Sequence, residues 1–180
     1  MKYDYLHQIG NVNSFKTYEK LISILRLGCI SSRKELENNG IKNDYDSSTF
    51  KLEVPKGKEW MYYSVDIHFD RVSLSNANNE FIRTAIELRD HANFSCFDYN
   101  NIGIVFSSQI DPILIDKDET KGLALGEVQV KEKLDLKFAT GLVVPYELEE
   151  LENATTYTIV DTLSLLCINA GYNLPIINYD

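Results

Sequence analysis

The stretch YLHQIGNVNSFKTYEKLISILRLGCISSR, residues 5–33, decides the fold expected for the beginning of this chain. Residues 3–8 alternate between apolar and polar side chains well enough to predict a β-strand that contains His7, and GNVN at 10–13 is expected to end it. A histidine just ahead of a loop and a helix has two interpretations. The segment is either the ordinary beginning of a small domain or the first half of a nucleotide pocket, whose other half then lies far downstream.

A helix is predicted directly after this strand. Asn13 or Ser14 is its expected N-cap, because short polar side chains accept hydrogen bonds from the free N–H groups of the first turn. Gly28 stands where a helix commonly ends in the left-handed conformation. The apolar spacing predicts an inward face made of Phe15, Tyr18, Leu21, Ile22 and Leu25.

Length and composition indicate one globular domain over residues 1–180. Hydrophobic residues make up 44% of the chain and charged residues 25%, which is ordinary for a folded protein. The net charge of -9 argues against a broad electrostatic hold on DNA or RNA, although it leaves room for a local basic groove.

The cysteines and the N-terminus favour a cytoplasmic protein with reduced thiols. Cys29, Cys96 and Cys167 are far apart and lack CxxC spacing, so we expect neither a disulfide framework nor a metal site. The opening MKYDYLHQIG carries charges where a signal peptide needs an apolar run, and no later stretch is long enough to span a membrane. No membrane association is expected.

Strands and helices are predicted to mix along the remainder of the chain without regular βαβ alternation, which indicates the α+β class. Residues 37–50 read as a long exposed loop, and the aromatic cluster at 60–63 as a strand at the edge of the core. Further strands are expected at 72–75, 102–107, 113–115, 127–130 and 140–144. Helices are expected at 79–88 and 158–170, and the acidic run 147–152 is expected to open a further helical segment.

The chain lacks the common cofactor signatures, but three short motifs follow one another along it. No phosphate loop, GxGxxG, HExxH or GxSxG occurs, and no local signature supports a Cys-His nucleophile pair. Instead, YLHQ with SILRLGCI is followed by VSLS at 72–75 and then by GEVQV and GLVVP at 126–145.

With these motifs the chain resembles the ADP-ribosyltransferase-like superfamily, and in particular its small histidine-type members, which include DarT-like toxins and other phage and bacterial effectors. Those members share an LHH or LYH opening followed by sIL..G.I, and an ending of the form EV.V…GI.VP. The resemblance covers most of residues 3–145. It implies two small packed, mainly antiparallel sheets with flanking helices, and NAD as the substrate.

The resemblance also implies a role for four residues. His7 would hold the NAD ribose, Ser73 and Ser75 would shape the nicotinamide pocket, and Glu127 would be catalytic. The chemistry suits these residue types, because a carboxylate stabilises the positive charge that develops on the ribose as nicotinamide leaves. A neutral histidine can bond a ribose hydroxyl from either ring nitrogen.

The loop before Glu127 is the candidate target-recognition loop, with Lys121 and Leu125 as its candidate residues. Family members that modify arginine or asparagine carry Glu or Gln two residues before the catalytic glutamate. Leu125 occupies that place here, so we do not expect those two acceptors. The arginines considered for the NAD phosphates are Arg33, Arg71, Arg83 and Arg89.

The leading hypothesis is therefore an NAD-dependent ADP-ribosyltransferase, a toxin or phage effector, that acts on a macromolecule, with protein favoured over nucleic acid. One alternative is a non-catalytic module of the same fold that binds a basic protein. Another is an enzyme like the RNA 2′-phosphotransferases, for which the chain lacks a basic cluster. Both enzymatic hypotheses require His7 and Glu127 to converge on one cleft, and they lose their basis if the two side chains point to opposite faces.

Each site residue also has an ordinary structural interpretation. His7 alone reads as a half-buried strand residue bonded to a backbone carbonyl. The serines alone read as a strand end that caps the next helix, and Glu127 as a solvent-facing strand residue.

Overall fold

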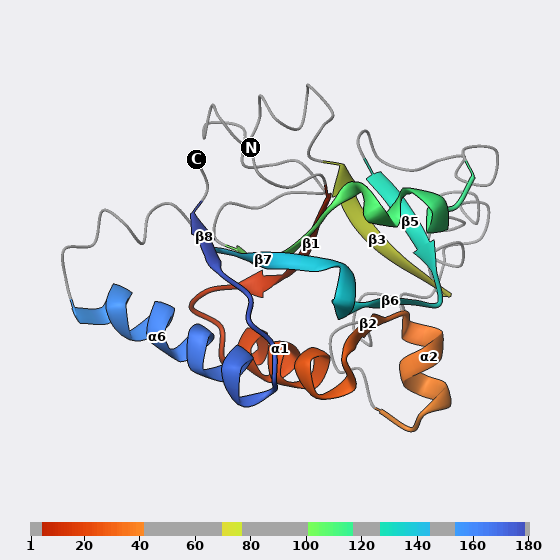
Figure 1. The fold of residues 1–180 in the computed structure, drawn as a ribbon. Helices are drawn as coiled ribbons and strands as arrows, with labels where there is room; N and C mark the ends of the chain where they lie inside the picture. Colours follow the sequence, from red (N-terminus) through yellow and green to blue (C-terminus); the bar gives the residue numbers. More distant parts are fainter. Residues whose placement is uncertain (1–4, 42–69, 77–100, 117–126, 145–153, 179–180) are drawn as a thin grey trace, which may run out of the picture.

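Figure 1 shows the computed structural model of the chain, which describes residues 5–41, 70–76, 101–116, 127–144 and 154–178. The following predictions lie wholly or mostly outside these residues: the loop at 37–50, the aromatic cluster at 60–63, the helix at 79–88 and the acidic run at 147–152. The single domain over the whole chain stays a prediction. Within the described residues no helix is both long and apolar enough to cross a membrane.

The described strands form one large sheet and one small sheet (Figure 1). The large sheet has six strands in the order β5-β3-β1-β4-β7-β8, and its pairs are antiparallel except for the parallel pair β7–β8. Its strands are β1 (Tyr5–Asn11), β3 (Arg71–Asn76), β4 (Asn101–Phe106), β5 (Glu127–Lys131), β7 (Ala139–Val144) and β8 (Ile176–Asn178). The small sheet pairs β2 (Cys29–Ser31) with β6 (Lys133–Asp135). The α+β class is confirmed, but the two sheets are of unequal size.

Strand β1 runs three residues further than GNVN had suggested. Its register against β4 shifts between Gln8 and Gly10, so the chain absorbs the turn-forming residues as a bulge and continues to Asn11. A Cβ at Gly10 would lie 2.6 Å from the Thr17 hydroxyl oxygen. That hydroxyl donates to the carbonyl of Asn11 at 2.7 Å, so the first helix is bound closely to the end of the strand.

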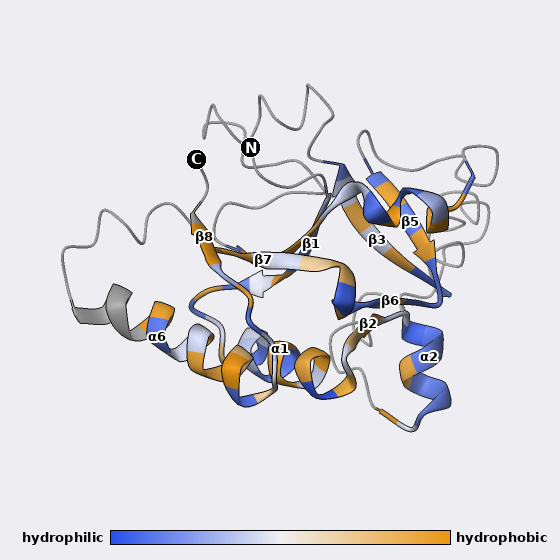
Figure 2. Cartoon of the chain, viewed as in Figure 1, coloured by the Kyte–Doolittle hydropathy of each residue, from blue (hydrophilic) through white to orange (hydrophobic). Residues whose placement is uncertain are grey.

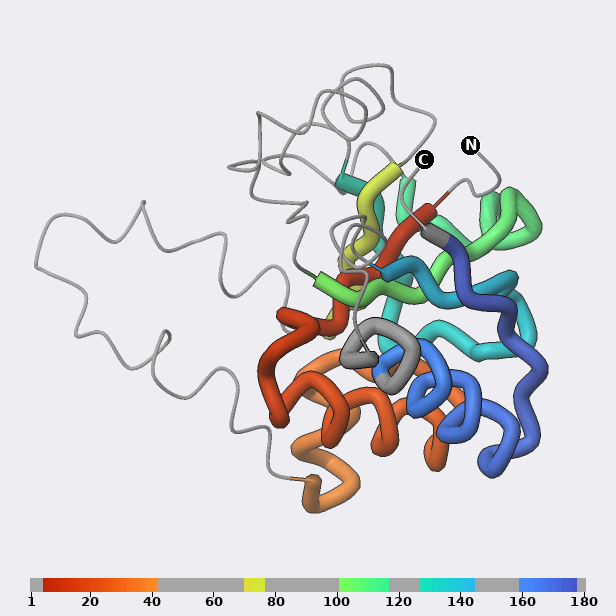
Figure 3. Tube along the Cα trace, turned by 90° about the vertical axis from the view of Figure 1, so that its left-hand side faces the viewer, coloured from red at the N-terminus to blue at the C-terminus, as the bar shows by residue number. Residues whose placement is uncertain are grey.

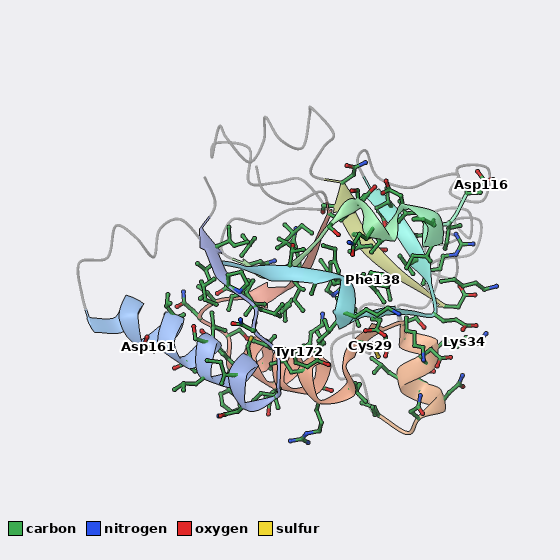
Figure 4. All side chains as sticks on the ribbon, viewed as in Figure 1. Cys29, Lys34, Asp116, Phe138, Asp161 and Tyr172 are labelled. Atoms are coloured by element: carbon green, nitrogen blue, oxygen red, sulfur yellow. The ribbon has the colours of Figure 1, made fainter. Side chains whose placement is uncertain are left out.

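Helix α1 (Phe15–Leu27) begins after Ser14 and ends at Gly28, as predicted, but the side chain of Ser14 does not form the expected cap hydrogen bond. Gly28 has φ of 72°, and its N–H donates to the carbonyl of Ile24 at 2.9 Å. A Cβ at Gly28 would also lie 2.8 Å from the hydroxyl of Tyr172, which Figure 4 labels beside the end of α1. Glycine therefore meets both a conformational and a steric requirement at this position.

The inward face of α1 differs in part from the predicted one. Its buried residues are Thr17, Leu21, Ile24 and Leu25. Phe15 is 75% exposed and Ile22 37% exposed, so placing them on the inward face was wrong. The stripe that starts at Thr17 packs against the sheet, and Phe15 and Ile22 belong to a neighbouring stripe of the helix.

Two further elements departed from expectation. Helix α2 (Arg33–Asn38) was not predicted, although Ser32 caps it by accepting from the N–H of Glu35 at 3.2 Å, and this Ser-x-x-Glu spacing is a sequence signature of a helix start. The strand predicted at 113–115 was wrong. A 3-10 helix, η2 (Ser108–Ile113), ends at the first residue of that stretch, and Leu114 forms only an isolated bridge to Val130.

Helices α1 and α6 (Ala154–Asn169) lie side by side on one face of the large sheet (Figures 1 and 3). Figure 2 shows apolar residues repeating along both helices, whereas α2 is mostly hydrophilic. The core between helices and sheet includes Leu21, Leu25, Ile30, Val72, Leu74, Ile104, Phe106, Val130, Leu142 and Leu163. Leu6, Val105 and Val143 belong to the other face of the sheet and are also buried.

Candidate functional site

A set of polar side chains shares one face of strands β3 and β5. The register pairs Ser75 with Glu127, and Ser73 with Gln129. Side chains of a strand alternate between the two faces of a sheet. The alternate residues Val72, Leu74, Val128 and Val130 pack in the core, so the set lies on the face away from α1. We call it the β3–β5 polar face, and it comprises Arg71, Ser73, Ser75, Glu127 and Gln129.

Gln129 is the centre of the hydrogen bonds on this face. Its side-chain Nε2 donates to the hydroxyl of Ser73 at 3.3 Å and to Oε1 of Glu127 at 3.4 Å. Its Oε1 accepts from Nη1 of Arg71 at 3.2 Å. Gln129 is fully buried and Ser75 is nearly so, while Glu127 is half-buried. The carboxylate of Glu127 is therefore held by a buried amide rather than turned freely to solvent.

His7 is tied to β3 through the backbone. Its Nδ1 lies 3.0 Å from the carbonyl oxygen of Ser73, just beyond the pair that Leu6 forms with Ser75. The pKa of His7 is lowered from 6.5 to about 4, mainly by burial and in addition by the positive charge of Lys20, against the raising effect of the Ser73 carbonyl. The ring is therefore neutral at neutral pH, with Nδ1 carrying the proton that is donated to Ser73.

The other ring nitrogen of His7 lacks a hydrogen bond. Nε2 is buried, and it has no partner among the residues that the structure describes. A neutral ring that donates from Nδ1 leaves Nε2 with an unused lone pair.

The register places His7 and Glu127 on opposite faces of the sheet. His7 pairs with Ile104, and Ile104 belongs to the core between the sheet and the helices. Glu127 points to the other face with Ser75. The side chains of His7 and Glu127 therefore do not converge on one cleft. His7 instead bonds a backbone carbonyl, as its ordinary structural interpretation predicts.

A connection between His7 and Glu127 nevertheless exists through Ser73. The carbonyl of Ser73 accepts from His7, and its hydroxyl accepts from Gln129, which also donates to Glu127. Of the predicted site residues, Ser73, Ser75 and Glu127 come together directly. Lys121 and Leu125 lie outside the described residues, so their role in target recognition stays a prediction.

The arginines considered for phosphate binding have protein partners where they are described. Nε of Arg33 lies 3.1 Å from the carboxylate of Glu37, one turn along α2. Arg71 bonds Gln129 and lies 3.7 Å from the carboxylate of Asp70. Arg83 and Arg89 are outside the described residues.

The described part of the chain contains two cysteines and no cluster of the residue types that bind metals. No group of three or more His, Cys, Asp or Glu residues there could hold a metal ion. Cys29 and Cys167 are free thiols, and burial raises the pKa of Cys167 to about 11, so that thiol stays protonated. Cys96 lies outside the described residues.

Gln129 is the site residue that the sequence analysis missed. The motif GEVQV contains the available signal, because residues two apart on a strand share a face. A glutamine two positions after a candidate catalytic glutamate is within reach of it once both stand on one strand.

Comparisons with known proteins add little to this geometry. No family model matches the chain, and no curated protein matches it. Among solved structures, DarT of Thermus sp. 2.9 in complex with carba-NAD+ is similar with a TM-score of 0.48 and 10% sequence identity, over 99% of this chain and 96% of that chain. At these values the likeness carries no argument about fold, site or ligand.

Proposed function

We propose that the protein is an NAD-dependent ADP-ribosyltransferase whose catalytic residue is Glu127. The observation that carries the proposal is the placement of Glu127 on the β3–β5 polar face, opposite Ser75 and held by Gln129. It brings the second and third motifs of the family resemblance onto adjacent strands. The toxin or phage-effector setting and a macromolecular acceptor, protein rather than nucleic acid, belong to the same proposal.

The proposed reaction breaks the bond between nicotinamide and C1′ of the ribose. Nicotinamide leaves as a neutral molecule, and positive charge develops on the ribose. The carboxylate of Glu127 stabilises this charge and bonds the 2′-hydroxyl, while the hydroxyls of Ser73 and Ser75 offer bonds to the nicotinamide amide. An acceptor nucleophile then bonds to C1′ and loses its proton. Held by a buried amide, the carboxylate needs little reorganisation during this step.

The placement of His7 and Glu127 on opposite faces removes the basis for a reaction in which both side chains hold the ribose. The proposal therefore keeps only Glu127 and the two serines beside NAD, and His7 takes a different part from the one that the resemblance implies. Its bond to the carbonyl of Ser73 joins β1 to the part of β3 that carries Ser73 and Ser75. In this arrangement His7 supports the strand that carries Ser73 and Ser75, and it does not contact the ribose beside Glu127.

The test is nicotinamide release from NAD by the purified protein, with Glu127→Gln beside it. The variant should lose about 10²–10³-fold in turnover, as enzymes do when one preorganised electrostatic group is removed. Glu19→Gln is the matched control, because Glu19 is exposed on α1, and it should leave turnover unchanged. Retained turnover in Glu127→Gln would remove Glu127 from the mechanism.

The second candidate function is a non-catalytic module that binds a basic protein through the acidic surface of the chain, which has a net charge of -9. The observation in its favour is the placement of His7 and Glu127 on opposite faces. It predicts neither NAD binding nor nicotinamide release at millimolar NAD. Release that Glu127→Gln abolishes would exclude it as the sole function.

A further inference from the structure

We propose that Gln129 is a positioning residue for Glu127, and that Arg71 sets the direction of the Gln129 amide. This inference rests on the proposed function, because it concerns the same carboxylate. It starts from two hydrogen bonds that join Arg71, Gln129 and Glu127, and from a third that links Gln129 to Ser73.

The direction of the amide follows from what each neighbour can donate or accept. A glutamine side chain has an acceptor oxygen at one corner and a donor NH2 at the other, whereas arginine only donates and an ionised carboxylate only accepts. Nη1 of Arg71 lies 3.2 Å from the amide oxygen, and the carboxylate of Glu127 lies 3.4 Å from the amide nitrogen. Turning the amide over would oppose donor to donor at Arg71 and acceptor to acceptor at Glu127. Arg71 therefore selects the orientation that presents NH2 to Glu127.

Burial makes this selection firm. Gln129 has no exposed surface, so water cannot replace a lost partner of its amide. Its backbone is also held, because the carbonyl of Gln129 accepts from the N–H of Ile115 at 2.9 Å. The amide thus projects from a fixed point of β5 toward Ser73 and Glu127.

The consequence concerns the rotamer of Glu127. One carboxylate oxygen, Oε1, is engaged by Gln129, so rotation of the carboxylate about its terminal bonds costs a buried hydrogen bond. A carboxylate that stabilises charge at one carbon of a substrate must be kept in one geometry before substrate arrives. Gln129 supplies that restraint without contacting the reacting atoms.

Three variants separate the parts of this arrangement. Gln129→Glu keeps an acceptor for Arg71 but removes the donor to Glu127. Arg71→Met removes the donor that orients the amide, and Arg71→Lys restores a donor. Gln109→Glu is the matched control, since Gln109 is exposed in η2.

The first measurement is steady-state release of nicotinamide. Misplacing a catalytic group can cost about 10²-fold in rate, and we expect a fall of that order in kcat for Gln129→Glu, with KM for NAD within about twofold. Arg71→Met should lower kcat by a smaller factor, and Arg71→Lys should recover most of the loss. Unchanged kcat in Gln129→Glu would overturn the role of Gln129. A merely structural role would instead reduce the folded fraction and leave kcat per folded molecule intact.

The second measurement is independent of turnover. The side-chain NH2 of Gln129 should give distinct, slowly exchanging signals in ¹H–¹⁵N spectra, and these should shift in Arg71→Met and in Glu127→Gln but not in Gln109→Glu. Absent shifts would overturn the hydrogen-bond chain itself. If the native protein releases no nicotinamide while the shifts occur, the proposed function fails and the positioning role falls with it, although the contacts stand.

Discussion

The two faces of strands β3 and β5 are built from opposite kinds of side chain. Toward α1 and α6, Val72, Leu74 and Val130 are at most 3% exposed and belong to the core. On the other face, Ser73 and Gln129 belong to a connected set of hydrogen bonds. Because successive side chains of a strand point to opposite faces, neighbours along the same strand serve stability and candidate chemistry separately.

His7 is the exception that sharpens this difference. It is a titratable side chain on the core face, where burial and Lys20 keep it neutral and one nitrogen is bonded to the carbonyl of Ser73. On the other face Glu127 is half-buried and bonded to an amide that donates to it. The titratable group on the core face therefore makes a structural contact, whereas the one on the polar face is the candidate for charge stabilisation.

The largest expected effect comes from the core face. Leu74→Ala should lower the free energy of unfolding by about 2–5 kcal/mol, because it deletes buried apolar atoms and leaves a cavity. Leu165→Ala is the control, since Leu165 is 58% exposed on α6 and should cost much less. Denaturant unfolding measures both. Equal effects at the two positions would contradict the assignment of Leu74 to the core.

A pH effect of intermediate size is expected from His7. The unfolded chain takes up a proton near pH 6.5, but folded His7 does so only near pH 4. Stability is therefore full above about pH 6.5 and falls as the pH drops toward 4, by up to about 3 kcal/mol at 1.36 kcal/mol per pKa unit. Denaturant unfolding at several pH values should show this fall in the native chain.

The control for the pH effect is His7→Gln, which can still donate to a carbonyl but does not titrate. The part of the pH dependence that belongs to His7 should be missing in this variant. An identical pH profile for the variant and the native chain would show that His7 is not buried in the neutral form.

The smallest expected effect comes from the polar face. Ser73→Ala removes one acceptor of the Gln129 amide and should cost about 1 kcal/mol of unfolding free energy. The backbone carbonyl that His7 bonds is untouched, so the His7-dependent pH profile should persist. A loss as large as that of Leu74→Ala, or a changed pH profile, would mean that the two faces are not independent.

The elements that the sequence predicted correctly are those with a local signal. Strands β3, β5 and β7 show period-two or β-branched patterns within a few residues, and α1 ends at a glycine whose positive φ few other residues adopt. The strands β2, β6 and β8 were missed. Each has three residues, and each is defined by a distant partner, as Cys29 pairs with Asp135 and Leu142 with Ile176.

What the sequence by itself determined is the set of residue types and the strands that carry them. The sequence assigns Ser73, Ser75 and Glu127 to strands, because neighbouring residues alternate between apolar and polar side chains. Only the tertiary structure decided the rest, because strand register and the face on which each side chain lies follow from pairing between distant segments. It turned His7 toward the face of the sheet that the helices cover, and it placed Gln129 against Glu127. Which polar groups meet depends on how whole strands pack.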